Sequence, residues 1–208
     1  MTRPSRARRG DPERALLDAG RRLFARRGYE AVSIDEIAAE AGLAKGLLYY
    51  YFTGKRALYL EVVRAAGEEL AARTAPDPDL PPGERTAAVL DAVIAWAKEY
   101  GESTRLLLAQ NTGADPELRA IVQAGRDRQA EMMLDGLRRT GAELGKPPLP
   151  DTPLLRHAVH GWIAFIEAVL AQWLEKPDVS ERELRTLFLH AAGGFLAAAR
   201  RTNPGPTQ

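Results

Sequence analysis

Apolar residues recur every three or four positions along most of this chain, the spacing that places them on one face of an α-helix. The alternation with a period of two that indicates β-strands is absent. Alanine, leucine, glutamate and arginine, which favour helices, dominate the sequence. The pattern predicts an all-α protein of about nine helices, near residues 12–27, 33–41, 45–51, 55–73, 84–100, 104–111, 115–144, 152–176 and 180–201.

Local signals mark the ends of these helices. Asp11 can cap the first helix, with Pro12 at its first position. Ser33 and Glu36 form a capping box, in which each side chain can satisfy a backbone N–H of the other residue. No helix can cross the proline-rich residues 75–83, which are either a domain linker or a loop within the second domain.

The charges divide the chain into a basic first part and a mildly acidic remainder. Residues 1–56 carry 12 Lys and Arg against 7 Asp and Glu, and residues 57–208 carry 17 against 21, so the net charges are +5 and −4. A basic head suggests a polyanionic partner, although a solvated arginine-rich terminus has the same composition. We expect one domain over residues 1–56, a helical domain over 57–202 and a disordered tail over 203–208.

The composition also excludes several classes of protein. The absence of cysteine excludes disulfides, thiolate zinc sites and cysteine nucleophiles. No secretory signal and no membrane-spanning apolar run is evident, so we expect a cytoplasmic protein. There is no phosphate loop, dinucleotide turn or nucleophile elbow, so we expect neither an enzyme nor a cofactor. His157 and His160 share a helix face but lack an evident acidic partner, and we expect no metal site.

Residues 33–52 are the informative segment. A capped helix, a tight turn around Gly42 and a second short helix form a candidate helix-turn-helix motif. Leu48 and Phe52 lie four residues apart and should enter a small core with Ile37 and Phe24. The opposite face then presents Lys45, Leu47, Tyr50 and Tyr51 to the outside.

Three consecutive tyrosines stand in this second helix. A buried tyrosine needs a partner for its hydroxyl, so some of these hydroxyls should face water or a phosphate group. The alternative is a tyrosine-rich packing face within a helical bundle. Lys55 begins the next helix, where a positive charge is mildly unfavourable for helix stability, so a lysine there suggests that an anion binds at this point. The alternative is that Lys55 is an incidental surface lysine.

Residues 12–63 resemble the DNA-binding domain of the TetR (tetracycline repressor) family. The order and spacing of the matching residues agree without a gap over about fifty residues. The matching elements are Ala19 to Leu23-Phe24, Gly28-Tyr29, Ile37-Ala38, Ala41-Gly42-Leu43, Lys45-Gly46, Leu48-Tyr49-Tyr50-Tyr51-Phe52, Lys55 and Leu58. The resemblance implies a three-helix DNA-binding head followed by a helical ligand-binding and dimerisation domain.

The resemblance also implies roles for individual residues. Lys45, Gly46 and Leu47 match positions that meet base edges, and Tyr49 and Tyr51 match positions that contact phosphate. Ser33 and Lys55 match positions that contact the DNA backbone. Tyr50 matches a position at the groove edge, and Ala44 matches the start of the recognition helix. The family often has serine, threonine and histidine at positions 44, 47 and 51, so the operator sequence cannot be inferred from these residues.

Helix-turn-helix proteins usually bind two half-sites as symmetric dimers. Small and apolar residues form stripes on the last two predicted helices, which we expect to make a homodimer interface, as the TetR resemblance also implies; the alternative is packing within one subunit. The stripes consist of Ala158, Gly161, Phe165, Ala168, Leu184, Leu187, Phe188, Ala191, Gly194, Phe195 and Ala198.

The resemblance further implies a ligand pocket in the second domain, whose occupation weakens DNA binding. Candidate lining residues combine aromatic and sulfur-containing side chains with two polar ones: Trp96, Tyr100, Arg126, Gln129, Met132, Met133 and Trp162. Such a pocket would suit a hydrophobic or aromatic small molecule. Alternatively, the polar members are satisfied core or interface residues.

These observations predict a sequence-specific transcriptional regulator, a repressor that binds a palindromic DNA operator as a homodimer and is released by a small-molecule effector. The alternatives are an activator, a regulator without a ligand, and a helical interaction module whose basic arm binds a membrane or an acidic protein. Such a module would bind DNA only weakly and without sequence preference. The identity of the effector does not follow from the residues.

Overall fold

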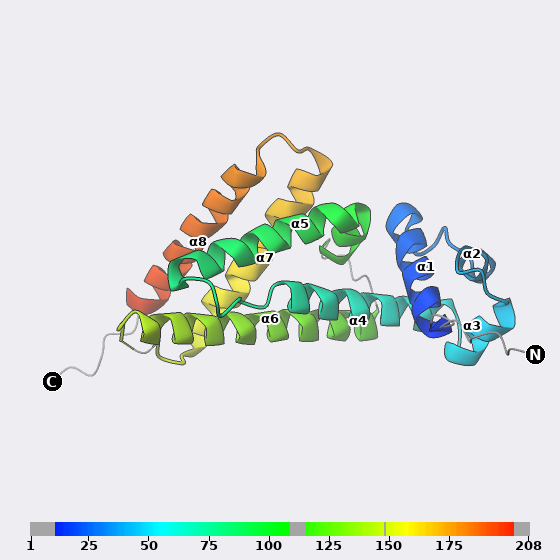
Figure 1. The fold of residues 1–208 in the computed structure, drawn as a ribbon, viewed down its shortest axis with the longest axis horizontal. Helices are drawn as coiled ribbons and strands as arrows, with labels where there is room; N and C mark the ends of the chain where they lie inside the picture. The colour runs from blue at the N-terminus through cyan, green and yellow to red at the C-terminus, as the bar shows by residue number, and fades with distance from the viewer. Residues whose placement is uncertain (1–10, 109–114, 148, 202–208) are drawn as a thin grey trace, which may run out of the picture. The chain divides into compact units, whose positions relative to one another are not determined.

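The computed structural model describes residues 11–108, 115–147 and 149–201. Over these residues the protein consists of eight α-helices without strands (Figure 1). The helices are α1 (Pro12–Arg27), α2 (Ile34–Glu40), α3 (Lys45–Tyr51), α4 (Lys55–Arg73), α5 (Pro82–Leu108), α6 (Pro116–Glu143), α7 (Pro153–Glu175) and α8 (Glu181–Arg201). The predicted all-α class is confirmed.

One predicted helix boundary is wrong. The sequence predicts separate helices at residues 84–100 and 104–111, whereas α5 continues without interruption to Leu108, and residues 109–111 lie outside the described residues. Gly101 lies within α5, and an interior glycine costs a helix only about 1 kcal/mol, which the rest of a long helix can offset. This continuity explains why eight helices are described instead of about nine.

The chain divides into two compact units, residues 1–66 and 67–208, which we call the head and the body. The division falls within α4, after Ala66, and not at residue 56, where the sequence analysis placed it. The reason is that the first half of α4 belongs to the core of the head, to which it contributes Leu58 and Val62. The tail predicted over residues 203–208 lies outside the described residues.

The head is built on α1, which packs against α2 and α3. Asp11 caps α1 by accepting a hydrogen bond from the backbone N–H of Glu13, as its position before Pro12 predicted. The predicted meeting of Phe24, Ile37, Leu48 and Phe52 in one core is confirmed. This core fixes the direction in which α3 presents its opposite face.

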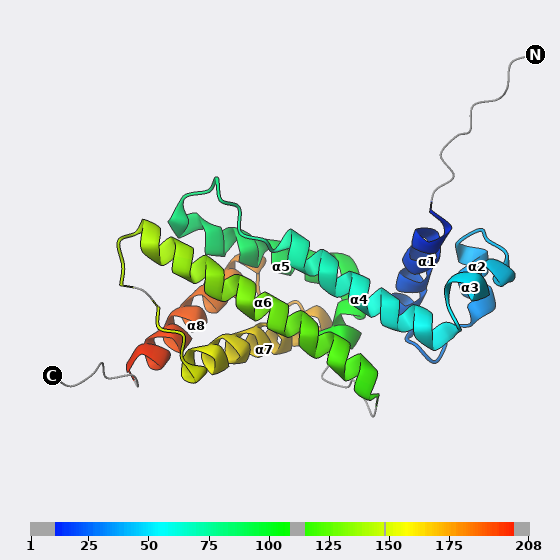
Figure 2. The ribbon, with the colours of Figure 1, turned by 90° about the horizontal axis from the view of Figure 1, so that it is seen from below.

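The body is organised around α7, which packs against α5, α6 and α8. Figure 2 shows this arrangement of the four helices from a second direction. By length and composition alone α7 could cross a membrane, since its most apolar 18-residue window has a mean hydropathy of 1.3. The same property is typical of a core helix, and seven residues of α7, including Trp162 and Ile166, are buried in the body.

Candidate nucleic-acid interface and ligand cavity

The helix-turn-helix motif begins with a complete capping box. The Ser33 backbone N–H donates to Oε2 of Glu36 at 2.8 Å, and the Glu36 N–H donates to the Ser33 hydroxyl at 3.2 Å. Arg27 donates a further hydrogen bond to the Glu36 carboxylate at 2.6 Å. The bonds that the Glu36 carboxylate accepts, from Arg27 first and then from the backbone N–H and the hydroxyl of Ser33, lower the pKa of Glu36 to about 2.

A tight turn connects α2 to α3. Gly42 has a φ of +68°, a left-handed conformation that glycine adopts without steric cost. The N–H of Leu43 then donates to the carbonyl of Ala38 at 2.9 Å, which closes the turn. The positive φ predicted for Gly42 from the sequence is therefore confirmed.

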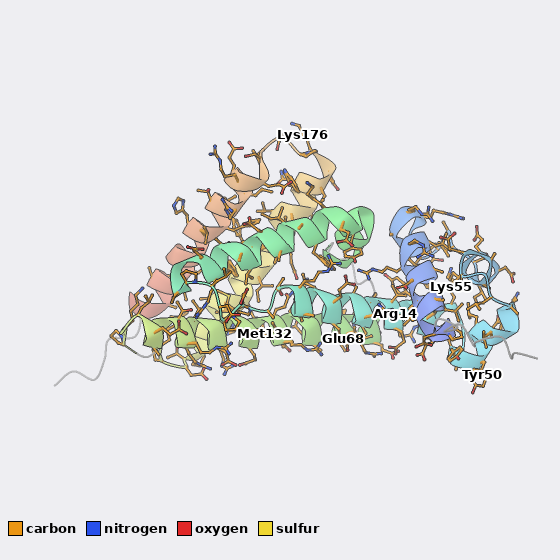
Figure 3. The ribbon with its side chains drawn as sticks, in the orientation of Figure 1. Arg14, Tyr50, Lys55, Glu68, Met132 and Lys176 are labelled. Atoms are coloured by element: carbon orange, nitrogen blue, oxygen red, sulfur yellow. The ribbon has the colours of Figure 1, made fainter. Side chains whose placement is uncertain are left out.

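The three tyrosines of α3 differ in their exposure. Tyr49 and Tyr50 are 51% and 78% exposed, and Tyr50 projects away from the helix (Figure 3). Tyr51 is half-buried against the core of the head, and its ring meets that of Tyr50 edge-on at 5.1 Å. The exposed face predicted for Lys45, Leu47, Tyr50 and Tyr51 is therefore correct for Lys45 and Tyr50, whereas Leu47 and Tyr51 are only partly exposed.

At the N-terminus of α3, Lys45 is the one residue whose side chain carries a charge. Ala44 occupies the N-cap position and makes no side-chain capping bond, and Gly46 adds no side chain. Both residues are exposed, so a partner could approach the backbone closely at this point. Lys45 is the one charged residue within α3.

Lys45 is held by an aspartate that the sequence analysis did not single out. Its Nζ lies 2.8 Å from Oδ1 of Asp35, at the start of α2, and the Asp35 carboxylate raises the pKa of Lys45. Both side chains are exposed, so the pair is in contact with water. No sequence signal identified this pair, because the two residues belong to different helices and meet only through the turn.

Lys55 is positioned by the loop between α1 and α2. Its Nζ lies 4.3 Å from the centroid of the Tyr29 ring and donates a 3.4 Å hydrogen bond to the carbonyl of Glu30. Tyr29 in turn packs on Tyr59, with ring centroids 4.8 Å apart. These two contacts position the Lys55 ammonium group at the N-terminus of α4, where Figure 3 labels the residue.

The body contains a cavity of about 560 Å³. Five of the residues predicted to line a pocket do line it: Trp96, Gln129, Met132, Met133 and Trp162. Met132 lies on α6 in Figure 3.

Two predicted lining residues are not part of the cavity wall. The hydroxyl of Tyr100 donates to Glu69 at 2.7 Å. Arg126 instead makes a two-pronged ion pair with Glu167, at 2.7 to 3.0 Å, and Glu167 does line the cavity. The arginine side chain is long enough to reach a carboxylate on a neighbouring helix, and the spacing of residues along α6 alone could not predict this contact.

Charged side chains also line the cavity, and the sequence analysis missed them. They are Arg85, Arg139, Glu143, Lys146 and Glu167. Arg85 donates to both oxygens of Glu143 at 2.9 and 2.8 Å and to the carbonyls of Pro78 and Leu80. This bonding ties the proline-rich segment to α5 and α6, so the segment belongs to the body and is not a free linker.

The stripes predicted for dimerisation separate into buried and exposed members. Leu184 and Phe188 are 2% and 0% exposed within one subunit, so the prediction that they contact a second copy is wrong. The Trp162 indole N–H donates to the Phe188 carbonyl at 3.1 Å inside this core. Ala168, Leu187, Gly194 and Ala198 are exposed, and Ala158, Gly161, Phe165, Ala191 and Phe195 are partly exposed.

Comparison with known proteins identifies both units. The family model "Bacterial regulatory proteins, tetR family" matches residues 16–62, and "Tetracyclin repressor-like, C-terminal domain" matches residues 82–193. The chain is 29% identical over 143 residues to the HTH-type transcriptional activator FasR of Mycolicibacterium smegmatis, covering 66% of this chain and 64% of FasR. It is 27% identical over 130 residues to the HTH-type transcriptional repressor Rv1474c of Mycobacterium tuberculosis, covering 61% and 64%.

Solved structures agree with this assignment. A tetR-family regulator from Streptomyces coelicolor is 26% identical, with a TM-score of 0.78 over 92% of this chain and 82% of that one. FadR from Bacillus subtilis, solved with stearoyl-CoA, shares the fold at 19% identity, with a TM-score of 0.67 over 88% and 97%. The matches to FasR and Rv1474c each span less than two thirds of the relative's length. With family models covering its head and most of its body, the chain belongs to the TetR family of bacterial regulatory proteins.

Proposed function

We propose that this protein is a cytoplasmic transcriptional repressor that binds a palindromic DNA operator as a homodimer and is released by a small molecule. The observation that carries the proposal is the face of α3, where Lys45, Tyr49 and Tyr50 are exposed on a helix fixed by a buried core. Membership of the TetR family supports it.

The head supplies two kinds of DNA contact in this proposal. Lys45, Gly46 and Leu47, next to Ala44, approach base edges in the major groove, where a lysine can bind guanine and an apolar group a thymine methyl. The positioning contacts to the DNA backbone come from Ser33, Tyr49, Tyr51 and Lys55, and Tyr50 lies at the groove edge. Lys45 must exchange its bond to Asp35 for a bond to the base.

The dimer forms through the exposed members of the two stripes. Leu187 is 46% exposed, and Gly194 and Ala198 follow it on α8 at helical spacing. Small side chains at these positions let a second helix approach closely, and a large apolar side chain among them gains from burial. A twofold dimer would read half-sites separated by about 34 Å or a multiple of that distance.

The cavity of the body binds the effector. Its volume lies within the range of small-molecule sites, and aromatic, methionine and aliphatic side chains form most of its wall. The Bacillus subtilis FadR, which shares this fold, was solved in complex with stearoyl-CoA, a ligand with a long apolar chain, and this supports an effector cavity here. FasR is named an activator, which keeps activation as the alternative.

The test of the head is a DNA-binding titration by fluorescence anisotropy across a salt series. We expect Lys55→Ala to weaken binding and to reduce the slope of log K against log salt by about 1, since one phosphate contact is lost. The matched control is Lys176→Ala, because Lys176 is an exposed lysine of the body paired with Asp178 (Figure 3). Equal slopes for the wild type and Lys55→Ala would show that Lys55 contacts no phosphate.

The interaction module remains the second candidate, and the basic composition of residues 1–56 favours it. It predicts the same weak affinity for every DNA sequence. A competition titration with unrelated DNA separates the two functions, because only a sequence-specific regulator retains binding in excess competitor.

A further inference from the structure

We infer that the cavity of the body takes an amphipathic anion, with its apolar part inside and its anionic head bound by Arg139 and Lys146. The inference rests on the proposed function, because it assumes that the cavity is the effector site. It adds the chemical class of the effector, which the apolar part of the wall alone does not define.

The charged residues of the wall carry the argument, because each carboxylate there already has an arginine partner. Glu143 accepts from Arg85, and Glu167 accepts from Arg126. Arg85 is also bonded to two carbonyls and its side chain is only 14% exposed, so it serves the protein itself. Neither acid is left to attract a cationic ligand or to neutralise further cations.

Two positively charged side chains of the wall are not neutralised by a carboxylate of the wall. Among the residues that the structure describes, neither Arg139 nor Lys146 is assigned an ion pair or a side-chain hydrogen bond, and both are exposed. Arg139 lies one helical turn before Glu143 on α6. Lys146 follows the end of α6, where its backbone N–H bonds the carbonyl of Gly141 at 2.8 Å.

Most of the remaining wall is apolar, and its polar members are Gln129 and three threonines, Thr74, Thr86 and Thr140. Val93, Trp96, Trp162 and Ile166 line it, and three of these are buried. An apolar chain gains about 25 cal/mol for each Å² that it removes from water, whereas a charged group placed here would lose its hydration without a partner. A ligand that satisfies both regions needs a separate apolar part and an anionic head.

A carboxylate and a phosphate both fit the two cations, because arginine and lysine bind either group through charge-assisted hydrogen bonds. The two sources of the same chemistry are therefore a free acid and a phosphate-bearing derivative. A neutral ligand of equal apolar size would leave the cations unused. The preference for an anion is the property to measure.

The experiment titrates purified full-length protein with dodecanol, dodecanoate and dodecyl phosphate, below the concentrations at which these compounds form micelles. The readout is tryptophan fluorescence, since Trp96 and Trp162 are in the cavity wall. We expect the two anions to bind about five- to tenfold more tightly than dodecanol at low salt, as two exposed ion pairs allow. The tighter of the two anions identifies the head group.

The double variant Arg139→Glu with Lys146→Glu should abolish this preference and leave the affinity for dodecanol unchanged. The matched control is Arg128→Glu, an exposed arginine of α6 outside the cavity wall, which should keep the preference. The larger side chain of Val89→Phe narrows the cavity and should weaken all three probes, which distinguishes cavity binding from surface adsorption.

Four results would overturn the inference. If the wild type binds dodecanol and both anions with equal affinity, the effector needs no anionic head, but the cavity can still be the effector site. A preference that survives in the double variant assigns the head to other residues. Failure of all three probes, or binding that Val89→Phe leaves unchanged, contradicts the effector cavity itself and the inference with it.

Discussion

Lys45 and Asp35 form an ion pair across the turn of the helix-turn-helix, with the lysine Nζ 2.8 Å from Oδ1 of the aspartate. The cation expected to meet DNA is therefore held by an anion of its own protein before DNA arrives. This arrangement orients the lysine while placing a negative charge beside the expected path of the phosphate backbone.

Asp35→Asn should tighten DNA binding by about two- to fivefold, because it removes both the competing ion pair and the like-charge repulsion of phosphate. The folded state should be little affected, as the pair is exposed. Anisotropy titrations of the two proteins on one DNA measure the change. A large loss of affinity would instead show that Asp35 makes a DNA contact of its own.

Low pH should lower the stability of the head, because it protonates the carboxylate of Glu36. Hydrogen bonds from Arg27 and Ser33 lower its pKa to about 2, below the ordinary value of 4.5. Because the folded-state pKa is the lower one, this stabilisation is present above about pH 4.5 and is lost as the pH falls toward 2.

Glu36→Gln removes this titration, so its melting temperature should fall less steeply from about pH 5 to about pH 3 than that of the wild type. Glu68→Gln, which removes an exposed carboxyl group of the body (Figure 3), serves as the control and should retain the wild-type slope. Parallel pH profiles for the wild type and Glu36→Gln would contradict the assignment.

Most of the head could be predicted from its sequence because its signals are local. Asp11, the Ser33–Glu36 box and Gly42 each act within a few residues, and the four-residue spacing of Leu48 and Phe52 defines the buried face. The Lys45–Asp35 pair could not be predicted in this way, since it depends on the angle between two helices.

Leu187 and Phe188 are sequence neighbours with opposite surroundings. Phe188 is fully buried within one subunit, so Phe188→Ala should lower the free energy of unfolding by about 3–5 kcal/mol. Leu187 is 46% exposed, so Leu187→Glu should leave the subunit folded and raise the dimer dissociation constant. Sedimentation velocity and urea unfolding measure the two effects. A dimer unchanged by Leu187→Glu would place the interface elsewhere.

Arg126 and Glu167 form an ion pair that is largely shielded from water, with side chains 24% and 14% exposed. Glu167→Ala leaves the guanidinium without its partner and should cost about 1–3 kcal/mol of unfolding free energy. Glu181→Ala breaks the exposed pair with Lys98 and should cost less than about 1 kcal/mol. Urea unfolding at one protomer concentration compares them, and equal costs would contradict the importance of shielding.

The body was harder to predict because its contacts join residues far apart in sequence. Helical spacing identified apolar faces on α6, α7 and α8, but it could not tell a residue buried in one subunit, such as Phe188, from a surface neighbour such as Leu187. The partners of Arg126 and Arg85 lie 41 and 58 residues away, and no periodic pattern indicates them.

The most direct test of sequence-specific DNA binding by the head is a selection from random-sequence DNA with the purified full-length protein. A twofold dimer should enrich a palindrome whose half-sites lie about one helical turn, or a multiple of it, apart. Tyr49→Ala, which removes an exposed side chain of α3, should bind the enriched sequence more weakly than the wild type does. A selection that enriches no sequence would contradict the proposed regulator and favour a helical module that binds polyanions without reading them.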